Sequence, residues 1–343
     1  MAEFLLAYGL FFLKALTVVI AIAVVLILIF GLSRKDHGPG GLSVDNMNER
    51  FRKMRHTLRQ AVLGKHELKL LDKAEKKELK DMEKSAGEGD EARKRVFVLR
   101  FKGDIRASAT DSLREEVTAI VAVARPKDEV VVCIENPGGV VHDHGLAASQ
   151  LQRIRDRNIP LVAVVDKVAA SGGYLMACVA NRIIAAPFAI IGSIGVIAQL
   201  PNFNRALEDK GIDYEQVTAG KYKRTVTMFG KNTDEDRAKL KEELEDVHYL
   251  FKSMVAGYRP EMDIEKIATG EHWYGRQALE LGLIDELGAS DDYLLDAAES
   301  ADIYAVTFKG RQNLVQRLQD AMNDGASVVS DWVSTRQNES RYH

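Results

Sequence analysis

The sequence predicts an α/β protein in which an apolar N-terminal segment precedes one large folded domain. No residue is charged from Ala15 to Leu32, and an apolar run of this length is enough for a helix that crosses a bilayer. From Arg95 onward, short runs rich in β-branched residues alternate with longer amphipathic runs. This alternation is typical of α/β domains.

We interpret residues 1–33 as an uncleaved membrane anchor. Phe4 to Leu13 extends the apolar run, and the long side chain of Lys14 can reach the interface. A cleaved signal peptide is the alternative, but the run is long and bulky residues follow it in place of a small-residue cleavage site.

Residues 34–94 are predicted to form a charged helical linker. Asn46 to Lys84 is rich in Glu, Lys, Arg, Leu and Ala, and apolar residues recur at helical spacing from Phe51 to Ala61. We expect an amphipathic helix that lies on the membrane or packs on a neighbouring subunit, with a solvated spacer as an equal alternative. Ser85 to Asp90 predicts a break before the folded domain.

The folded domain is assigned to residues 95–300, and residues 301–343 to a C-terminal extension. We expect strands at Val96–Phe101, Glu129–Glu135, Leu161–Val165 and Arg182–Ala185, and helices at Thr110–Ala124, Val141–Asn158 and Tyr174–Val179. The nearly uncharged run 183–200 raises the alternative of a second membrane span. Pro187, Gly192 and Gly195 interrupt that run, so we favour a folded segment.

Composition excludes several classes of function. The net charge of −3 gives no general attraction to nucleic acid. Cys133 and Cys178 both lie in apolar runs, which predicts buried thiols and no disulfide framework. The chain has neither a clustered His/Cys ligand set nor a P-loop, so we expect no metal and no other cofactor.

Ser171 is the candidate nucleophile. The apolar run Leu161 to Val165 leads into a turn of small residues that contains this one hydroxyl, and an apolar helix follows. At such a junction the next backbone N–H groups point towards the group that the hydroxyl attacks. The alternative is a tight packing point that admits only small residues.

A lysine is the candidate base. His144 is the last histidine before Ser171 and His248 is the next one, and neither has an obvious active-site context. A neutral lysine accepts a proton when burial or a nearby positive charge lowers its pKa. Lys223 lies in a basic cluster with Lys221 and Arg224, which is otherwise typical of a solvated loop.

Two other lysines are weighed as the base. Lys221 is the rival within the cluster, since it lies close to Lys223 in the sequence. Lys167 is nearer to Ser171 in the sequence, but it precedes the turn and we expect it to point elsewhere.

Four motifs in this order resemble the signal peptide peptidase A family of membrane serine proteases, peptidase family S49. They are Asn136–Val140, Ala170–Tyr174 with Gly192–Val196, Tyr222–Lys223, and Gly270–Ala278 continuing to Gly282–Asp285. The resemblance covers residues 96–287. It implies a serine–lysine dyad of Ser171 and Lys223, and a spiral of β-β-α units like that of Clp protease and crotonase.

The resemblance also implies an assembly and a substrate. Relatives with one such domain per chain form rings in which adjacent subunits contribute the serine and the lysine. We therefore expect a homo-oligomeric ring that cleaves peptides or unfolded envelope proteins at the bacterial inner membrane.

Two glycines are the candidate oxyanion donors, because a missing Cβ lets a backbone N–H approach the substrate. We assign this role to Gly139 and Gly172, although Gly138 and Gly139 are also typical of a simple turn. Ser193 is a candidate for orienting the lysine amine, with a turn cap as the equal alternative.

The orientation of the anchor is predicted differently by two arguments. Basic residues gather after the apolar segment, from Arg34 to Arg55, and the positive-inside rule then puts the folded domain in the cytoplasm. The family resemblance favours the periplasmic face, which we prefer. Two other function classes remain, a non-catalytic membrane scaffold and an acyl-CoA-processing enzyme of the same fold.

Overall fold

A computed structural model describes residues 9–19, 41–85 and 93–309 of the chain. The chain divides into two units, residues 1–41 and residues 42–343. In the first unit, residues 9–19 are helical. Most of the predicted anchor, the predicted break after Ser85 and the chain beyond residue 309 lie outside the described residues. Within the described ranges, no helix combines the length and the apolar character that crossing a membrane requires.

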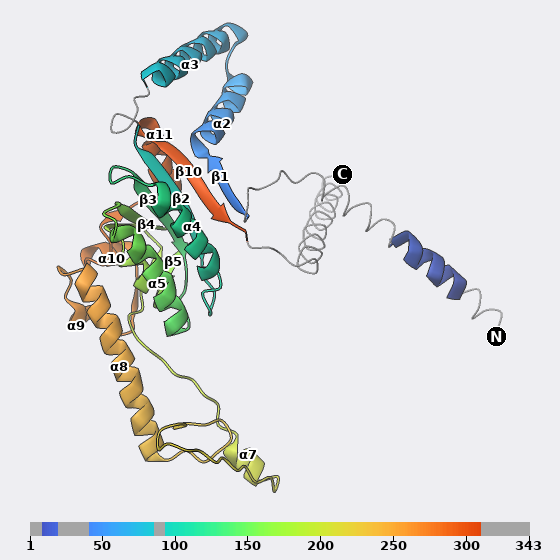
Figure 1. Cartoon of the computed structure of the whole chain (residues 1–343), viewed down its shortest axis with the longest axis vertical. Helices are drawn as coiled ribbons and strands as arrows, with labels where there is room; N and C mark the ends of the chain where they lie inside the picture. The colour runs from blue at the N-terminus through green and yellow to red at the C-terminus, as the bar shows by residue number, and fades with distance from the viewer. Residues whose placement is uncertain (1–8, 20–40, 86–92, 310–343) are drawn as a thin grey trace, which may run out of the picture. The chain divides into compact units, whose positions relative to one another are not determined.

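The second unit is built on a seven-stranded sheet (Figure 1). All neighbouring pairs are parallel except the pair β1–β10, which is antiparallel. In sheet order the strands are β1 (Leu42–Asn46), β10 (Asp302–Phe308), β2 (Arg95–Lys102), β3 (Glu129–Glu135), β4 (Leu161–Val165), β6 (Arg182–Ala185) and β9 (Glu286–Leu287).

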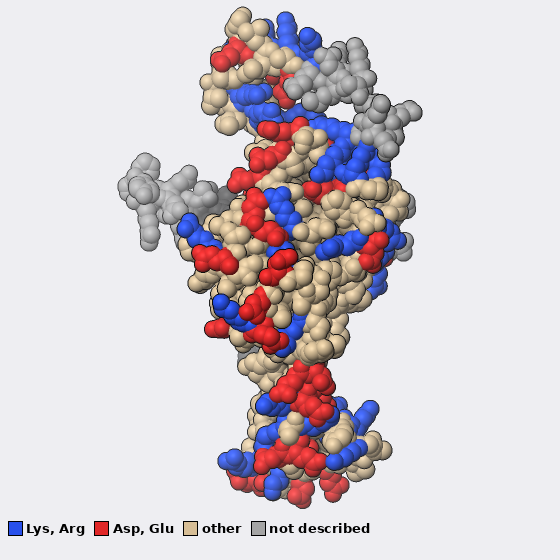
Figure 2. All heavy atoms as spheres, turned by 90° about the vertical axis from the view of Figure 1, so that its left-hand side faces the viewer, with Lys and Arg blue, Asp and Glu red and all other residues tan. Residues whose placement is uncertain are grey.

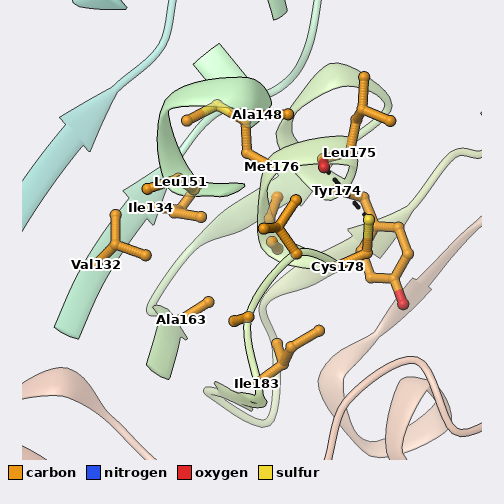
Figure 3. Close-up of a cluster of buried hydrophobic side chains, with 14 of the residues drawn as sticks. Val132, Ile134, Ala148, Leu151, Ala163, Tyr174, Leu175, Met176, Cys178 and Ile183 are labelled. Carbon is orange, nitrogen blue, oxygen red and sulfur yellow. Dashed lines mark hydrogen bonds between the residues drawn. The ribbon is translucent and has the colours of Figure 1, made fainter. Parts of the chain in front are cut away.

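The central strands are continuous apolar runs because helices cover both faces of the sheet. In β4 all five residues are buried. One face is covered by α4 (Thr110–Val123), α5 (Val141–Arg155) and α6 (Gly172–Ala177). The other face is covered by α2 (Met47–Val62) and α11 (Ser290–Ser300). Figure 3 shows the core of the first face, where Met176 of α6 lies near Leu151 of α5 and Ile134 of β3.

A second, three-stranded sheet branches from the first. It consists of β5 (Val168–Ala170), β7 (Ile190–Gly192) and β8 (His272–Tyr274), with β5 and β7 parallel and β7 and β8 antiparallel. β5 directly follows β4, and β7 directly follows β6, so the chain passes twice from the large sheet into the small one. The small sheet ends beside Ser171.

A long helix, α8 (Asp234–Tyr258), extends from this body (Figure 1). Thr233 and Asp236 cap its N-terminus reciprocally, which satisfies backbone N–H groups that a helix start leaves unpaired. Phe251 and Val255, near its C-terminal end, are buried. Three short helices in the described part of the chain are α7 (Asn204–Glu208), α9 (Ile264–Ile267) and α10 (Gly275–Glu280).

The structure differs from the predicted linker in two ways. The expected helix Asn46–Lys84 is two helices, α2 and α3 (Lys65–Ser85), because the chain breaks at Leu63 and Gly64. The preceding residues form β1, which pairs with β10 along its full length. A boundary at residue 95 therefore cuts through the sheet.

The C-terminal boundary is also too early. β10 begins at Asp302 and lies between β1 and β2, so the folded domain continues past residue 300. The run 183–200 includes β6 and β7, which are sheet strands and not a second span. Cys133 and Cys178 are free and buried, as predicted. Burial raises the pKa of Cys133 to about 11 and that of Cys178 to about 12.

Candidate active site

Ser171 lies at the end of β5 and immediately before α6. Its backbone has φ 52° and ψ −120°, a conformation that L-residues rarely adopt. The Ser171 N–H donates to the Gly192 carbonyl at 2.7 Å, which fixes the turn against β7. The side chain is half-buried, so the hydroxyl sits on a sharp strand-to-helix turn, as in nucleophile elbows.

The two residues after Ser171 must be glycines. A Cβ on Gly172 would lie 2.4 Å from Cγ of His144, and one on Gly173 would lie 2.1 Å from the Asn136 carbonyl oxygen. Both neighbours are buried and cannot move aside. The turn is therefore determined by close packing as well as by its conformation.

The loop Asn136–Gly139 faces this turn. Gly138 has φ +90°, and a Cβ there would lie 2.7 Å from Cβ of Ser171. Gly139 passes close to Ile105, whose carbonyl oxygen would lie 2.2 Å from an added Cβ. Among the described residues, the N–H groups of Gly139 and Gly172 have no hydrogen-bond acceptor. Both glycines and Ser171 line the same cavity, so two unpaired donors lie beside the hydroxyl.

Asn136 connects the loop to the turn. Its backbone N–H donates to Val168 O at 2.8 Å and its carbonyl accepts from Ala170 N at 3.0 Å, both in β5. Its side-chain oxygen accepts from Gly138 N at 2.9 Å. The side chain is fully buried. One residue thus holds the Gly138–Gly139 loop and strand β5 together.

His144 lies behind the same site. It is fully buried, with Nδ1 2.9 Å from Val140 O and Nε2 3.2 Å from Oδ1 of Asn136. Both ring nitrogens are therefore occupied by partners other than Ser171. His144 supports Asn136 and packs against Gly172. It therefore does not occupy the position of a general base for the Ser171 hydroxyl.

The cavity beside Ser171 is largely apolar and has a volume of about 180 Å³. Four residues of α8 line it as an apolar wall, together with residues of the glycine loop and the start of α6. The lining residues are Gly139, Val141, His144, Gly145, Ser171, Gly172, Leu175, Gly195, Val196, Val247, Leu250, Phe251 and Met254. Such a cavity suits an apolar side chain of a substrate.

Ser193 lies next to Ser171 because Ala170 of β5 pairs with Gly192 of β7. It has φ 54°, and its N–H donates to Glu271 O at 2.7 Å. Its position suits the orienting role predicted for it, but no lysine amine lies against its hydroxyl within the described residues.

Lys223 does not meet Ser171 within one chain. It is exposed, and the adjacent Tyr222 ring packs 5.2 Å from the Lys239 amine, in the first part of α8. The cavity contacts α8 only from Val247 onward. From Lys239 to Leu250 the helix rises roughly 16 Å, so the two members of the predicted dyad lie at different ends of α8.

Lys221 does not have the lowered pKa that the sequence suggested for a lysine in this cluster. Its contacts with Tyr222 and with Glu235, whose carboxylate is 2.9 Å away, raise its pKa instead. Opposite charge and hydrogen bonding favour the protonated amine. Lys167 pairs with Glu135 at 3.1 Å, away from the turn as expected.

Sequence reasoning missed the parts of the site that come from distant segments. Asn136 appeared only as the first residue of a motif, and His144 only as a histidine without an active-site context. The apolar residues of α8 had no assigned role. His248, also from α8, approaches Ile194 O at 3.2 Å. Across residues 9–19, 41–85 and 93–309, no three His, Cys, Asp or Glu side chains gather in a metal-binding arrangement.

Comparison with known proteins agrees with this geometry. Residues 3–151 match the family described as Peptidase family S49 N-terminal, and residues 153–304 match Peptidase family S49. The chain is 43% identical over 346 residues to a protein of Haemophilus influenzae named Probable protease SohB, with 98% of each chain covered. The chain belongs to peptidase family S49.

Other S49 relatives differ in how much they share with the chain. A protein of Buchnera aphidicola subsp. Schlechtendalia chinensis, also named Probable protease SohB, is 42% identical over 302 residues, which cover 85% of this chain and 99% of the relative. A protein of Enterococcus faecium named Putative signal peptide peptidase SppA is 30% identical, with 60% of this chain and 58% of its own covered. The S49 resemblance inferred from the four motifs is thus confirmed.

Proposed function

We propose that this S49 peptidase is a membrane-anchored serine endopeptidase that uses Ser171 as nucleophile and Lys223 as base. The main support is the turn at Ser171, which puts a hydroxyl on a strained backbone beside two unpaired N–H groups and an apolar cavity. This combination suits acyl transfer, in which a nucleophile and oxyanion donors must face the same carbonyl.

The reaction follows from these roles. The neutral amine of Lys223 accepts the Ser171 proton as Oγ attacks the peptide carbonyl. The N–H groups of Gly139 and Gly172 donate to the oxyanion, and the lysine then protonates the leaving amine. A water molecule, deprotonated by the same lysine, releases the acyl group from Ser171. Ser193 orients the amine through its hydroxyl.

The separation of Ser171 and Lys223 along α8 favours a dyad shared between copies of the chain. An adjacent subunit that brings its Tyr222–Lys223 segment to the cavity would complete the site. This agrees with the ring implied by the family resemblance. We also propose that the fold is a crotonase-like spiral. Its repeated units are passages such as β4–β5–α6.

The substrate is a peptide or an unfolded protein segment with an apolar residue at the cleavage site. The apolar wall of α8 supports this preference, since transfer of an apolar side chain from water into an apolar cavity is favourable. Residues 15–32 anchor the enzyme in the bacterial inner membrane, with the peptidase domain on the periplasmic face. There it would meet released signal peptides and damaged envelope proteins.

Hydrolysis of a fluorogenic apolar peptide and of unfolded casein tests the proposal. The detergent-solubilised wild type, Ser171→Ala and Lys223→Ala are compared at equal concentration. We expect activity in the wild type alone, because removal of a nucleophile or its base costs several orders of magnitude in rate. Lys167→Ala is the matched control, since this lysine pairs with Glu135 away from the turn, and it retains activity.

Activity that persists in Ser171→Ala would refute the serine mechanism. Activity that persists in Lys223→Ala would show that another group acts as the base. A Ser171→Ala protein that fulfils every cellular role would establish that the chain is a non-catalytic membrane scaffold. Turnover of a coenzyme A thioester would establish that it is an acyl-CoA-processing enzyme of the same fold.

A further inference from the structure

Helix α2 has an apolar stripe that is covered at one end and bare at the other. Met47 and Phe51, in its first turns, pack against the cluster between α2, α11 and the sheet. Met54, Leu58 and Val62 continue the same face at intervals of four residues and are 60%, 66% and 68% exposed. Three large apolar side chains in line therefore face outward from the second unit.

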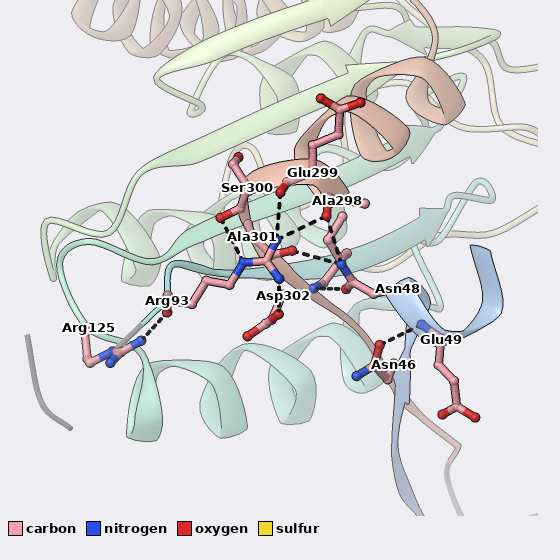
Figure 4. A network of polar contacts seen from close by, with 11 residues as sticks. Asn46, Asn48, Glu49, Arg93, Arg125, Ala298, Glu299, Ser300, Ala301 and Asp302 are labelled. Atoms are coloured by element: carbon pink, nitrogen blue, oxygen red, sulfur yellow. Dashed lines mark hydrogen bonds and ion pairs between the residues drawn. The ribbon is translucent and has the colours of Figure 1, made fainter. Parts of the chain in front are cut away.

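The base of α2 is rigidly held, so this exposure is a fixed feature. Asn46 caps the helix by accepting from Glu49 N. Asn48 donates to the carbonyls of Ala298 and Ala301 at 3.2 Å and 2.9 Å, and accepts from Ile303 N at 2.7 Å (Figure 4). The helix start is thus attached to the end of α11 and to β10, and its far half presents the stripe in one direction.

Basic residues border the exposed stripe on both sides. At 3.6 residues per turn, Arg50 lies along one edge with Lys53 beyond it, and Arg55 lies along the other edge. Glu49 is the only acidic residue of α2, and its carboxylate pairs with the Lys53 amine at 2.6 Å, which leaves Arg50 and Arg55 as the unopposed cations of the two edges within α2. Figure 2 shows Lys and Arg side chains, with Asp and Glu among them, at the α2–α3 end of the unit, at the top. An apolar stripe between basic borders is the pattern of a helix that lies in a membrane interface.

The chain itself supplies the reason for a lipid partner. The uncharged run of the proposed anchor ends at Leu32, and Met47 begins α2 roughly 15 residues later, a separation that an extended chain spans in at most about 50 Å. An anchored chain therefore holds α2 close to one bilayer surface. Phospholipids with negatively charged head groups complement the basic borders.

We propose that the far half of α2 lies on an anionic bilayer surface, with Met54, Leu58 and Val62 in the acyl boundary and Arg50, Lys53 and Arg55 at the head groups. This rests on the proposed membrane anchor. The contact makes α2 a second attachment of the peptidase domain, independent of its catalytic residues. It fixes the orientation of the sheet, and hence of the Ser171 cavity, relative to the membrane.

A fluorescent label on a cysteine at position 58 tests the proposal in the full chain. The Leu58→Cys protein is reconstituted into vesicles of phosphatidylcholine alone or with phosphatidylglycerol, and nitroxide-labelled lipids serve as quenchers. Cys133 and Cys178 are buried, so the label attaches at position 58. Gln60→Cys is the matched control, because residue 60 is also exposed but lies nearly opposite the stripe.

We expect several-fold stronger quenching at position 58 than at position 60 in the vesicles that contain phosphatidylglycerol. Arg50→Gln, Lys53→Gln and Arg55→Gln together should reduce it to the level seen in phosphatidylcholine. Equal quenching at both positions in protein that floats with the vesicles would overturn the α2 proposal and leave the anchor intact. Disulfide crosslinking of two copies through position 58 would overturn it in favour of a protein interface. A chain that floats with neither vesicle would refute the anchor and the α2 contact together.

Discussion

At the scale of single residues, the backbone of Ser171 is the most constrained feature of the site. A non-glycine residue at φ 52° and ψ −120° is strained by about 1–3 kcal/mol. The strain is retained because the turn is held by the Gly192 carbonyl and by tight contacts on Gly172 and Gly173. The conformation exposes Oγ at the start of α6.

The strain leads to a prediction about stability. The free energy of unfolding of Ser171→Gly should exceed that of Ser171→Ala by about 1 kcal/mol, because glycine adopts this conformation without steric conflict. Denaturant unfolding of the two variants measures the difference. If Ser171→Gly proves the less stable of the two, the turn is not strained.

Asn136 provides a second residue-scale prediction. Asn136→Ala leaves the Gly138 N–H without its acceptor, so stability should fall by about 1–3 kcal/mol. Because the loop then no longer holds Gly139, kcat should fall by about 10²–10³ with a smaller change in KM. Asn48→Ala is the matched control. It breaks a comparable buried network far from Ser171 and should lose stability while keeping its kcat.

At the scale of elements, β2 and β3 are joined at their start by the buried Asp128. Its carboxylate accepts from the backbone and side chains of both Arg95 and Arg125. Burial alone would raise the pKa of Asp128, but these hydrogen bonds outweigh it and hold the pKa well below its usual value. The ionised form is therefore favoured in the folded state.

This linkage determines how stability changes with pH. The contribution of Asp128 is complete above the ordinary carboxyl pKa of about 4 and is lost as pH falls through the lower folded value. We expect the free energy of unfolding of Asp128→Asn to be about 3–5 kcal/mol below that of the wild type at pH 7. When the pH is lowered from 5 to 2, the free energy of unfolding should fall less in the variant than in the wild type. Unfolding curves at several pH values test this; parallel pH profiles would contradict it.

Helix α8 contributes the apolar wall of the cavity, and Leu250 tests that contribution. Leu250→Asn should raise KM for an apolar peptide by about tenfold, since a lost apolar contact is worth roughly 1–2 kcal/mol. Its fold should be unaffected, because the side chain is 66% exposed. Tyr249→Asn is the control, with the same 66% exposure but no part in the cavity. Equal KM values for the two variants would exclude α8 from substrate binding.

At the scale of the whole molecule, the separation of Ser171 and Lys223 predicts complementation. Ser171→Ala and Lys223→Ala are each inactive in the proposed mechanism, but mixed rings contain sites that combine an intact serine with an intact lysine. In an equal mixture about a quarter of the sites should be complete. Peptide hydrolysis after co-assembly measures the recovery.

The control mixes each variant with the double variant Ser171→Ala/Lys223→Ala, which cannot complete a site. Recovery in the first mixture alone would establish a shared dyad. If no mixture recovers while the wild type is active, serine and lysine act within one chain, and the segment around Lys223 must then move along α8.

The sequence by itself determined the central strands and the turn at Ser171. Runs such as Leu161 to Val165 specify buried strands from composition alone, and the glycines after Ser171 specify the turn, because these features depend on neighbouring residues. The motifs around them were enough to indicate the family before any geometry was known.

Only the tertiary structure decided what depends on contacts between distant segments. β10 joins the sheet through pairing with β1 and β2, which no local pattern encodes. Asn136 and His144 acquire their roles because β3, α5 and α6 converge behind Ser171. The apolar wall exists because α8 packs across that opening, and the same long helix keeps Lys223 away from it. Local sequence specifies backbone conformation, whereas the long-range packing of the chain specifies which side chains share a site.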